Sequence, residues 1–196
     1  MTRWMLAAIV SAAVMSTACG DSGKADATAA LGAVQGSFDA VKAEAATYVP
    51  EQEDAVADAL ARVTYTLETG DYDRVRHDAA GLWPMIAAME QAVIVRKTEL
   101  TGSWAALSTS VPGALPTIQA RVETLSKAKV LPAAVSKDTL AGASAELGAI
   151  NDAWTDAADA FKRGNLVDAV RKGQRVQAQA SQVMTSLGMS LPESFK

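Results

Sequence analysis

The stretch LAGASAELGAINDAWTDAADAF, residues 140–161, decides the fold class. Its larger apolar side chains recur three and four residues apart, which is the spacing of one face of an α-helix. Many of the other residues are alanine, which has the highest helix propensity of all amino acids. The residues on the predicted face are Leu140, Ala143, Leu147, Ile150, Trp154, Ala157 and Phe161. The stretch therefore predicts a long amphipathic helix that begins near Ser136.

The residues after this helix predict a tight turn into a second one. Gly164 is the residue type that ends helices in a left-handed conformation, and Asn165 is a good cap for the next helix. Gly70 and Asp71 follow an earlier helical stretch in the same order. We therefore predict two helical hairpins, which turn at Gly70 and Gly164.

Helical spacing extends over most of the chain, and prolines punctuate it. Helices are expected over about 26–48, 51–69 and 72–109, with a kink or a new start at Pro84. The segment VPGALP, residues 111–116, predicts a break before a short helix that carries Ile118 and Leu125. The expected fold is all-α, a mostly antiparallel bundle of about six or seven helices. We expect a single domain over residues 26–190 and a loose tail over 191–196.

The N-terminal segment has the organisation of an export signal. Arg3 gives it a positive start, and an apolar run of about a dozen residues follows from Trp4. That run has the length of a signal-peptide apolar region and is shorter than the ~20 residues that span a bilayer. Ser16 and Ala18 are small residues of the kind that a signal peptidase accepts. Residues 1–18 are therefore predicted to be a signal peptide.

Cys19 comes directly after these small residues, and it is the only cysteine in the chain. The sequence STAC, residues 16–19, resembles the lipobox of bacterial lipoproteins, although Ser16 stands where that family prefers leucine. The resemblance implies cleavage before Cys19 and acylation of its thiol, with residues 19–25 as the lipidated cysteine and a short tether. In enterobacterial lipoproteins, an aspartate directly after the cysteine retains the protein at the inner membrane. This chain has Gly20 at that position, which slightly favours sorting to the outer membrane. Ser16 and Ala18 also fit ordinary secretion, which would leave a free thiol at Cys19.

Composition limits the partners that the chain is expected to bind. It has 196 residues and a formal net charge of −4, with 22 acidic and 18 basic residues. Nucleic-acid binding usually requires a basic surface, so no nucleic-acid partner is expected. The expected partners are a membrane, through the lipid anchor, and an envelope protein.

The chain shows no recognisable catalytic pattern, and we expect neither enzymatic activity nor a cofactor. His77 is its only histidine, and it lies off the apolar face that contains Val75. A second histidine, which a zinc site would normally use, is absent, so no metal ligands are assigned. A haem bundle that uses His77 with Met85 or Met89 is a minor alternative.

One basic cluster stands out in a chain that is otherwise acidic. It consists of Lys162, Arg163, Arg171, Lys172 and Arg175. The cluster either complements acidic side chains of the same protein or provides a contact for an anionic partner. Three tryptophans, Trp83, Trp104 and Trp154, fall at or beside the apolar faces and are expected in the core.

Three function classes follow from these observations. The first is a non-enzymatic cell-envelope lipoprotein that serves as an accessory, docking or structural component, facing the periplasm or the cell surface. The second is a periplasmic carrier of an apolar or lipid ligand bound between helices, and the third is the haem or metal bundle.

Overall fold

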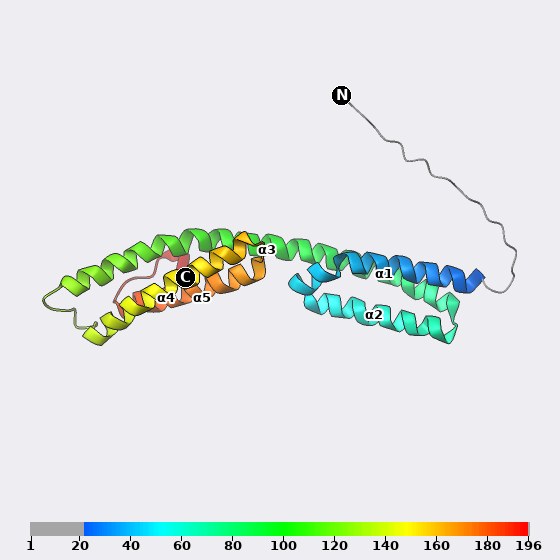
Figure 1. The fold of residues 1–196 in the computed structure, drawn as a ribbon, viewed down its shortest axis with the longest axis horizontal. Coiled ribbons are helices and arrows are strands. Elements are labelled where there is room, and N and C mark those ends of the chain that lie inside the picture. Colours follow the sequence, from blue (N-terminus) through cyan, green and yellow to red (C-terminus); the bar gives the residue numbers. More distant parts are fainter. Residues whose placement is uncertain (1–21, 196) are drawn as a thin grey trace, which may run out of the picture. The chain divides into compact units, whose positions relative to one another are not determined.

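The computed structural model describes residues 22–195, and these residues form helices and connecting loops without a strand. The helices are α1 (Ser22–Tyr48), α2 (Pro50–Thr69), α3 (Tyr72–Lys127), α4 (Lys137–Lys162) and α5 (Leu166–Ser186), followed by a short 3-10 turn, Glu193–Phe195 (Figure 1). The all-α prediction is confirmed. Cys19 and the predicted signal peptide lie outside the described residues.

The predicted count of six or seven helices was wrong, because the described chain has five α-helices. The difference arises in α3, which runs for 56 residues through Pro84 and through the predicted break at 111–116. Pro84, Pro112 and Pro116 are all exposed. Around the last two, Val111, Leu115 and Ile118 keep helical spacing and are buried. Burying each such side chain contributes about 1.5–3 kcal/mol, which offsets the ~3 kcal/mol cost of a proline inside a helix.

The described chain divides into two compact units. Unit 1 comprises residues 22–40 and 55–86, and unit 2 comprises residues 41–54 and 87–195. Helices α1, α2 and α3 each contribute residues to both units.

Unit 1 is built from three helical segments around an apolar core. The buried side chains recur at helical spacing and include Leu31, Val34 and Phe38 of α1, Val56, Leu60 and Val63 of α2, and Val75, Leu82 and Ile86 of α3. Helices α2 and α3 form the predicted hairpin at Gly70, which has a φ of +86°. Asp71 caps α3, where its Oδ1 accepts a hydrogen bond of 3.2 Å from the Arg74 N–H.

Unit 2 is held together by the second half of α3, by α4 and by α5. Its core contains a group of aromatic rings, in which Trp104 stacks with Trp154 at 5.3 Å between centroids and with Phe161 at 4.8 Å. The second hairpin turns at Gly164, with a φ of +81°, and Asn165 Oδ1 accepts from the Asp168 N–H at 3.0 Å. The cap predicted at Asn165 is present, and Ser136, where the long helix was expected to begin, caps α4.

Three local expectations differ from the structure. Helix α1 begins at Ser22, so the last residues of the predicted tether are helical. The C-terminal segment is not loose, because Met189, Leu191 and Phe195 pack against the unit 2 core. Trp83 is 45% exposed, whereas Trp104 is buried and Trp154 is partly buried, as predicted.

Within residues 22–195, no helix combines the length and the apolar character needed to cross a bilayer.

Candidate functional site: an apolar groove in unit 2

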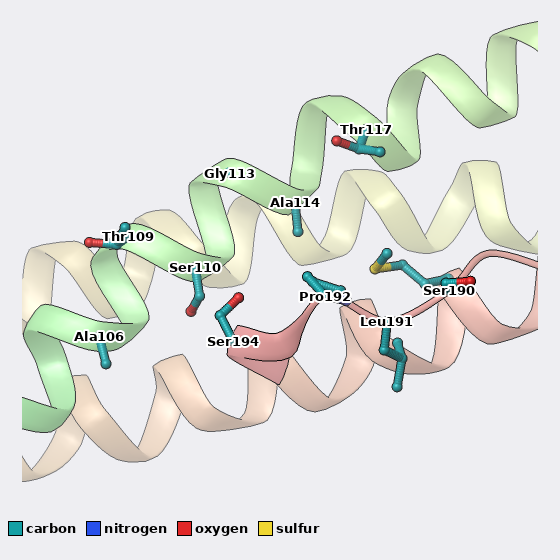
Figure 2. A pocket seen from close by; sticks show the side chains of 11 residues that line it. Ala106, Thr109, Ser110, Gly113, Ala114, Thr117, Ser190, Leu191, Pro192 and Ser194 are labelled. Atoms are coloured by element: carbon teal, nitrogen blue, oxygen red, sulfur yellow. The ribbon is translucent and has the colours of Figure 1, made fainter. Parts of the chain in front are cut away.

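A hollow in unit 2 lies between α3 and the segment that follows α5. Its volume is about 730 Å³. One wall consists of small residues of α3, and the other consists of Ser190, Leu191, Pro192 and Ser194. Figure 2 shows the side chains of Ala106, Ser110 and Ala114 pointing from α3 toward this segment. We call this hollow the apolar groove.

The groove exists because small residues recur on one face of α3. Ala106, Ser110, Gly113 and Thr117 are spaced three and four residues apart, so they fall on the same side of the helix. Their short side chains reach only a little way toward the facing segment, and space remains between the two walls. Met184 of α5 also lines the groove.

The C-terminal segment is held in place at several points. Leu191 and Phe195 pack against the core, and Gln177 Nε2 donates a hydrogen bond of 2.8 Å to the backbone oxygen of Ser194. A smaller hollow of about 350 Å³ shares Ala106, Ser110 and Ser194 with the groove and extends it toward Ser103.

The polar groups in the groove are hydroxyls, and its lining contains no charged residue. Thr109 Oγ1 donates a hydrogen bond to the backbone oxygen of Ala105, and Ser110 Oγ donates one to that of Leu107. These two hydroxyl protons are therefore not available to a ligand. The hydroxyls of Thr117, Ser190 and Ser194 have no protein partner within residues 22–195. This arrangement suits an apolar chain with an uncharged, hydrogen-bonding head group.

The predicted basic cluster lies elsewhere in unit 2, around the turn between α4 and α5, and lines none of this groove. Lys162 pairs with Asp159 at 2.9 Å, and Lys172 pairs with Asp168 at 3.2 Å. Arg171 also pairs with Asp168. Arg163 and Arg175 are exposed and have no ion pair in the described chain.

These ion pairs lower the pKa values of the two carboxyls. The hydrogen bond from Lys162 holds the pKa of Asp159 below its ordinary value, and the Lys162 charge acts in the same direction. The hydrogen bond from Arg171 lowers the pKa of Asp168, partial burial opposes this shift, and Lys172 adds to it. Three of the five cations therefore neutralise carboxylates of their own helices.

Of the residues considered for haem or metal binding, His77 and Met85 line the same hollow of about 340 Å³, and Met89 does not. His77 is exposed on α3, and Met89 is buried in the core. No group of three or more His, Cys, Asp or Glu side chains in the described part of the chain is placed to hold a metal ion.

Sequence reasoning did not identify the apolar groove. The signal that could have revealed it is the recurrence of Ala106, Ser110, Gly113 and Thr117 at helical spacing. Pro112 and Pro116 hide this pattern, because a proline inside a helical stretch normally ends or kinks the helix. Comparisons with protein-family models, with curated protein sequences and with solved structures gave no match.

Proposed function

We propose that the protein is a non-enzymatic cell-envelope lipoprotein, anchored through Cys19, that serves as an accessory, docking or structural component. The observation that supports this proposal most strongly is the position of Cys19. It ends a sequence that resembles a lipobox, and only Gly20 and Asp21 separate it from the first residue of α1.

The anchor would join the membrane almost directly to a helical scaffold. Each buried CH₂ group of an acyl chain contributes about 0.8 kcal/mol, so two or three chains hold a protein far more firmly than one. The mature chain would face the periplasm or the cell surface, with the outer membrane slightly favoured by Gly20. Docking of an anionic envelope partner would use Arg163 and Arg175, the two cations of the basic cluster that have no ion pair within residues 22–195.

The intact mass of the membrane-extracted protein tests this proposal. The wild-type chain should begin at Cys19 and carry a diacylglyceryl group, with or without an additional acyl chain. The Cys19→Ser variant should lose this mass and the membrane association, whereas the matched control Thr17→Ser should keep both. An unmodified wild-type mass would reject the anchor and indicate a soluble exported protein.

The apolar groove favours a second candidate function, the carriage of an apolar or lipid ligand. Its volume of about 730 Å³ falls within the ~300–1,000 Å³ of small-molecule sites. Its free hydroxyls and uncharged lining fit an uncharged acyl compound.

Titration with a fluorescent long-chain monoacylglycerol tests this carrier function. Ala106→Trp would fill the groove and should abolish binding. Ala105→Trp places the same ring on the neighbouring exposed position, outside the lining, and should leave binding intact. Absence of saturable binding, or equal binding by both variants, would reject the carrier function.

A further inference from the structure

The N-terminus of α1 lies beside the turn that joins α2 to α3. A Cβ atom built on Gly23 would lie 3.8 Å from Cδ2 of Tyr72 and 3.9 Å from Nη1 of Arg76. The first turns of α1 and α3 are therefore in contact, and α2 ends at Thr69, next to the turn at Gly70. We call this part of unit 1, residues 22–26 and 65–76, the hairpin end.

The proposed lipid anchor would keep the hairpin end close to the membrane. Three residue steps separate Cys19 from Ser22, and a fully extended chain covers at most about 10 Å over that length. This limit holds for every conformation of the intervening residues. The argument depends on the proposed acylation of Cys19.

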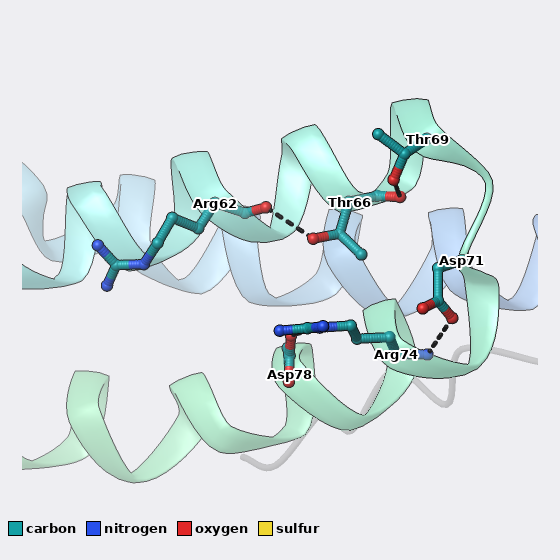
Figure 3. A network of polar contacts seen from close by, with 6 residues as sticks. All are labelled: Arg62, Thr66, Thr69, Asp71, Arg74 and Asp78. Atoms are coloured by element: carbon teal, nitrogen blue, oxygen red, sulfur yellow. Dashed lines mark hydrogen bonds and ion pairs between the residues drawn. The ribbon is translucent and has the colours of Figure 1, made fainter.

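The side chains of the hairpin end suit the head-group region of a bilayer. Tyr65 is 68% exposed and borders a hollow of about 590 Å³ at the end of α2. Tyrosine is enriched at membrane–water interfaces, because its ring is apolar and its hydroxyl is polar. In Figure 3, Arg62 extends from α2 away from Asp71, and the Arg74 side chain lies along α3 toward Asp78.

The charges of unit 1 are unevenly distributed along its length. Its four basic residues, Lys24, Arg62, Arg74 and Arg76, lie at the hairpin end or within one helical turn of it. Arg74 and Arg76 pair with Asp78 and Asp73, whereas Lys24 and Arg62 have no ion pair among the described residues. The acidic residues at or near this end are Asp26, Glu68, Asp71, Asp73 and Asp78, so positive and negative charges nearly balance there.

The rest of unit 1 carries only acidic charges, Asp39 and Asp58. Phospholipid phosphates attract cations and repel carboxylates, so the sides of unit 1 are less suited to the membrane surface than the hairpin end.

We propose that unit 1 stands on the bilayer through its hairpin end, with Tyr65 in the phospholipid head-group region. The tether length limits which end of unit 1 is close to the membrane, and exposed Tyr65 and exposed Lys24 provide the contact. Helices α1, α2 and the first part of α3 would then rise away from the membrane surface.

Depth-dependent quenching tests this orientation in the full lipidated chain, reconstituted in phosphatidylethanolamine–phosphatidylglycerol vesicles that contain a head-group nitroxide lipid. A thiol-reactive fluorophore is attached to one of three variants, Tyr65→Cys, Asp58→Cys or Met85→Cys. The probe labels only the introduced cysteine, because the acylated thiol of Cys19 does not react with it. Asp58 lies on the same face of α2 as Tyr65, about 10 Å further along the helix. Met85 on α3 lies about 20 Å along the helix from Tyr72.

We expect strong quenching at position 65, weaker quenching at 58 and almost none at 85. Equal quenching at positions 65 and 58 would mean that unit 1 lies flat on the membrane. If the protein floats with the vesicles but position 65 is not quenched, another face of unit 1 is nearest the membrane. Either result overturns the orientation and leaves the anchor intact. Failure of the wild-type chain to float with the vesicles would instead reject the anchor and, with it, the orientation.

Discussion

Gly173 of α5 faces Leu107 of α3 so closely that a Cβ atom on residue 173 would lie 3.0 Å from Cδ1 of Leu107. The same atom would lie 3.6 Å from Cζ3 of both Trp104 and Trp154. The missing side chain therefore lets α5 approach α3 and α4 at the aromatic part of the core. A glycine inside a helix lowers helix stability, and at this position close packing offsets that cost.

Gly173→Ala should lower the stability of unit 2 although alanine favours the helix. Alanine gains about 1 kcal/mol in helix propensity, but forcing a methyl group into a packed core costs about 1–3 kcal/mol. We expect a net loss of about 1 kcal/mol in chemical denaturation. Gly148→Ala is the matched control, because it lies inside α4, is exposed and has open space around its Cβ position. It should raise stability by up to about 1 kcal/mol, and a similar gain for Gly173→Ala would contradict the close packing.

Trp154→Ala should destabilise unit 2 strongly. Removing a packed tryptophan costs about 3–5 kcal/mol, and we expect the lower part of this range because Trp154 is only partly buried. The near-ultraviolet circular dichroism should also weaken, because Trp154 stacks with Trp104 at an interplanar angle of 5°. Trp83→Ala removes an exposed ring and should change stability by less than about 1 kcal/mol. Equal effects of the two substitutions would reject the assigned core.

Pro112→Ala should stabilise the protein. Pro112 is exposed within α3, so its replacement loses little packing and restores a backbone N–H to the helix. The propensity difference sets an upper limit of about 3 kcal/mol, and we expect a gain of about 1–2 kcal/mol in thermal or chemical denaturation. A loss of stability, or no change, would mean that the chain leaves the helix at this proline.

The Asp168 ion pairs should make stability depend on pH in the acidic range. The pKa of Asp168 is lower in the folded chain than its usual value of 3.8, first because Arg171 donates a hydrogen bond to it. A lowered pKa means that the folded state favours the carboxylate, so the contribution is complete above about 3.8 and disappears as the pH falls through the folded value. Asp168→Asn should therefore melt at a lower temperature than the wild type at pH 7.

The difference between the two melting temperatures should shrink as the pH falls below 4, and also in high salt, which screens the exposed arginine. A difference that stays constant from pH 7 to pH 2 would show that the amide substitution acts through packing or helix capping instead.

Local patterns in the sequence determined the helical nature of the chain and its two turns. Val75, Leu147 and Val176 recur on apolar faces and are buried, as their spacing indicates. Gly70 and Gly164 adopt positive φ angles because each ends a helix directly before an Asx cap. These features depend on residues within one or two turns of each other, so a single sequence contains the information.

Only the tertiary structure decided where α3 continues and where the apolar groove lies. Pro112 and Pro116 look like helix breakers locally, but burial of Val111, Leu115 and Ile118 against α4 and α5 offsets the lost hydrogen bonds. Likewise, the groove depends on where Leu191 and Pro192 lie relative to the small residues of α3, which come about 80 positions earlier in the chain. The local spacing of residues determines which face of a helix is apolar. The partner that covers that face, and the gap left beside it, depend on contacts between distant segments, whose side chains must fit together in three dimensions.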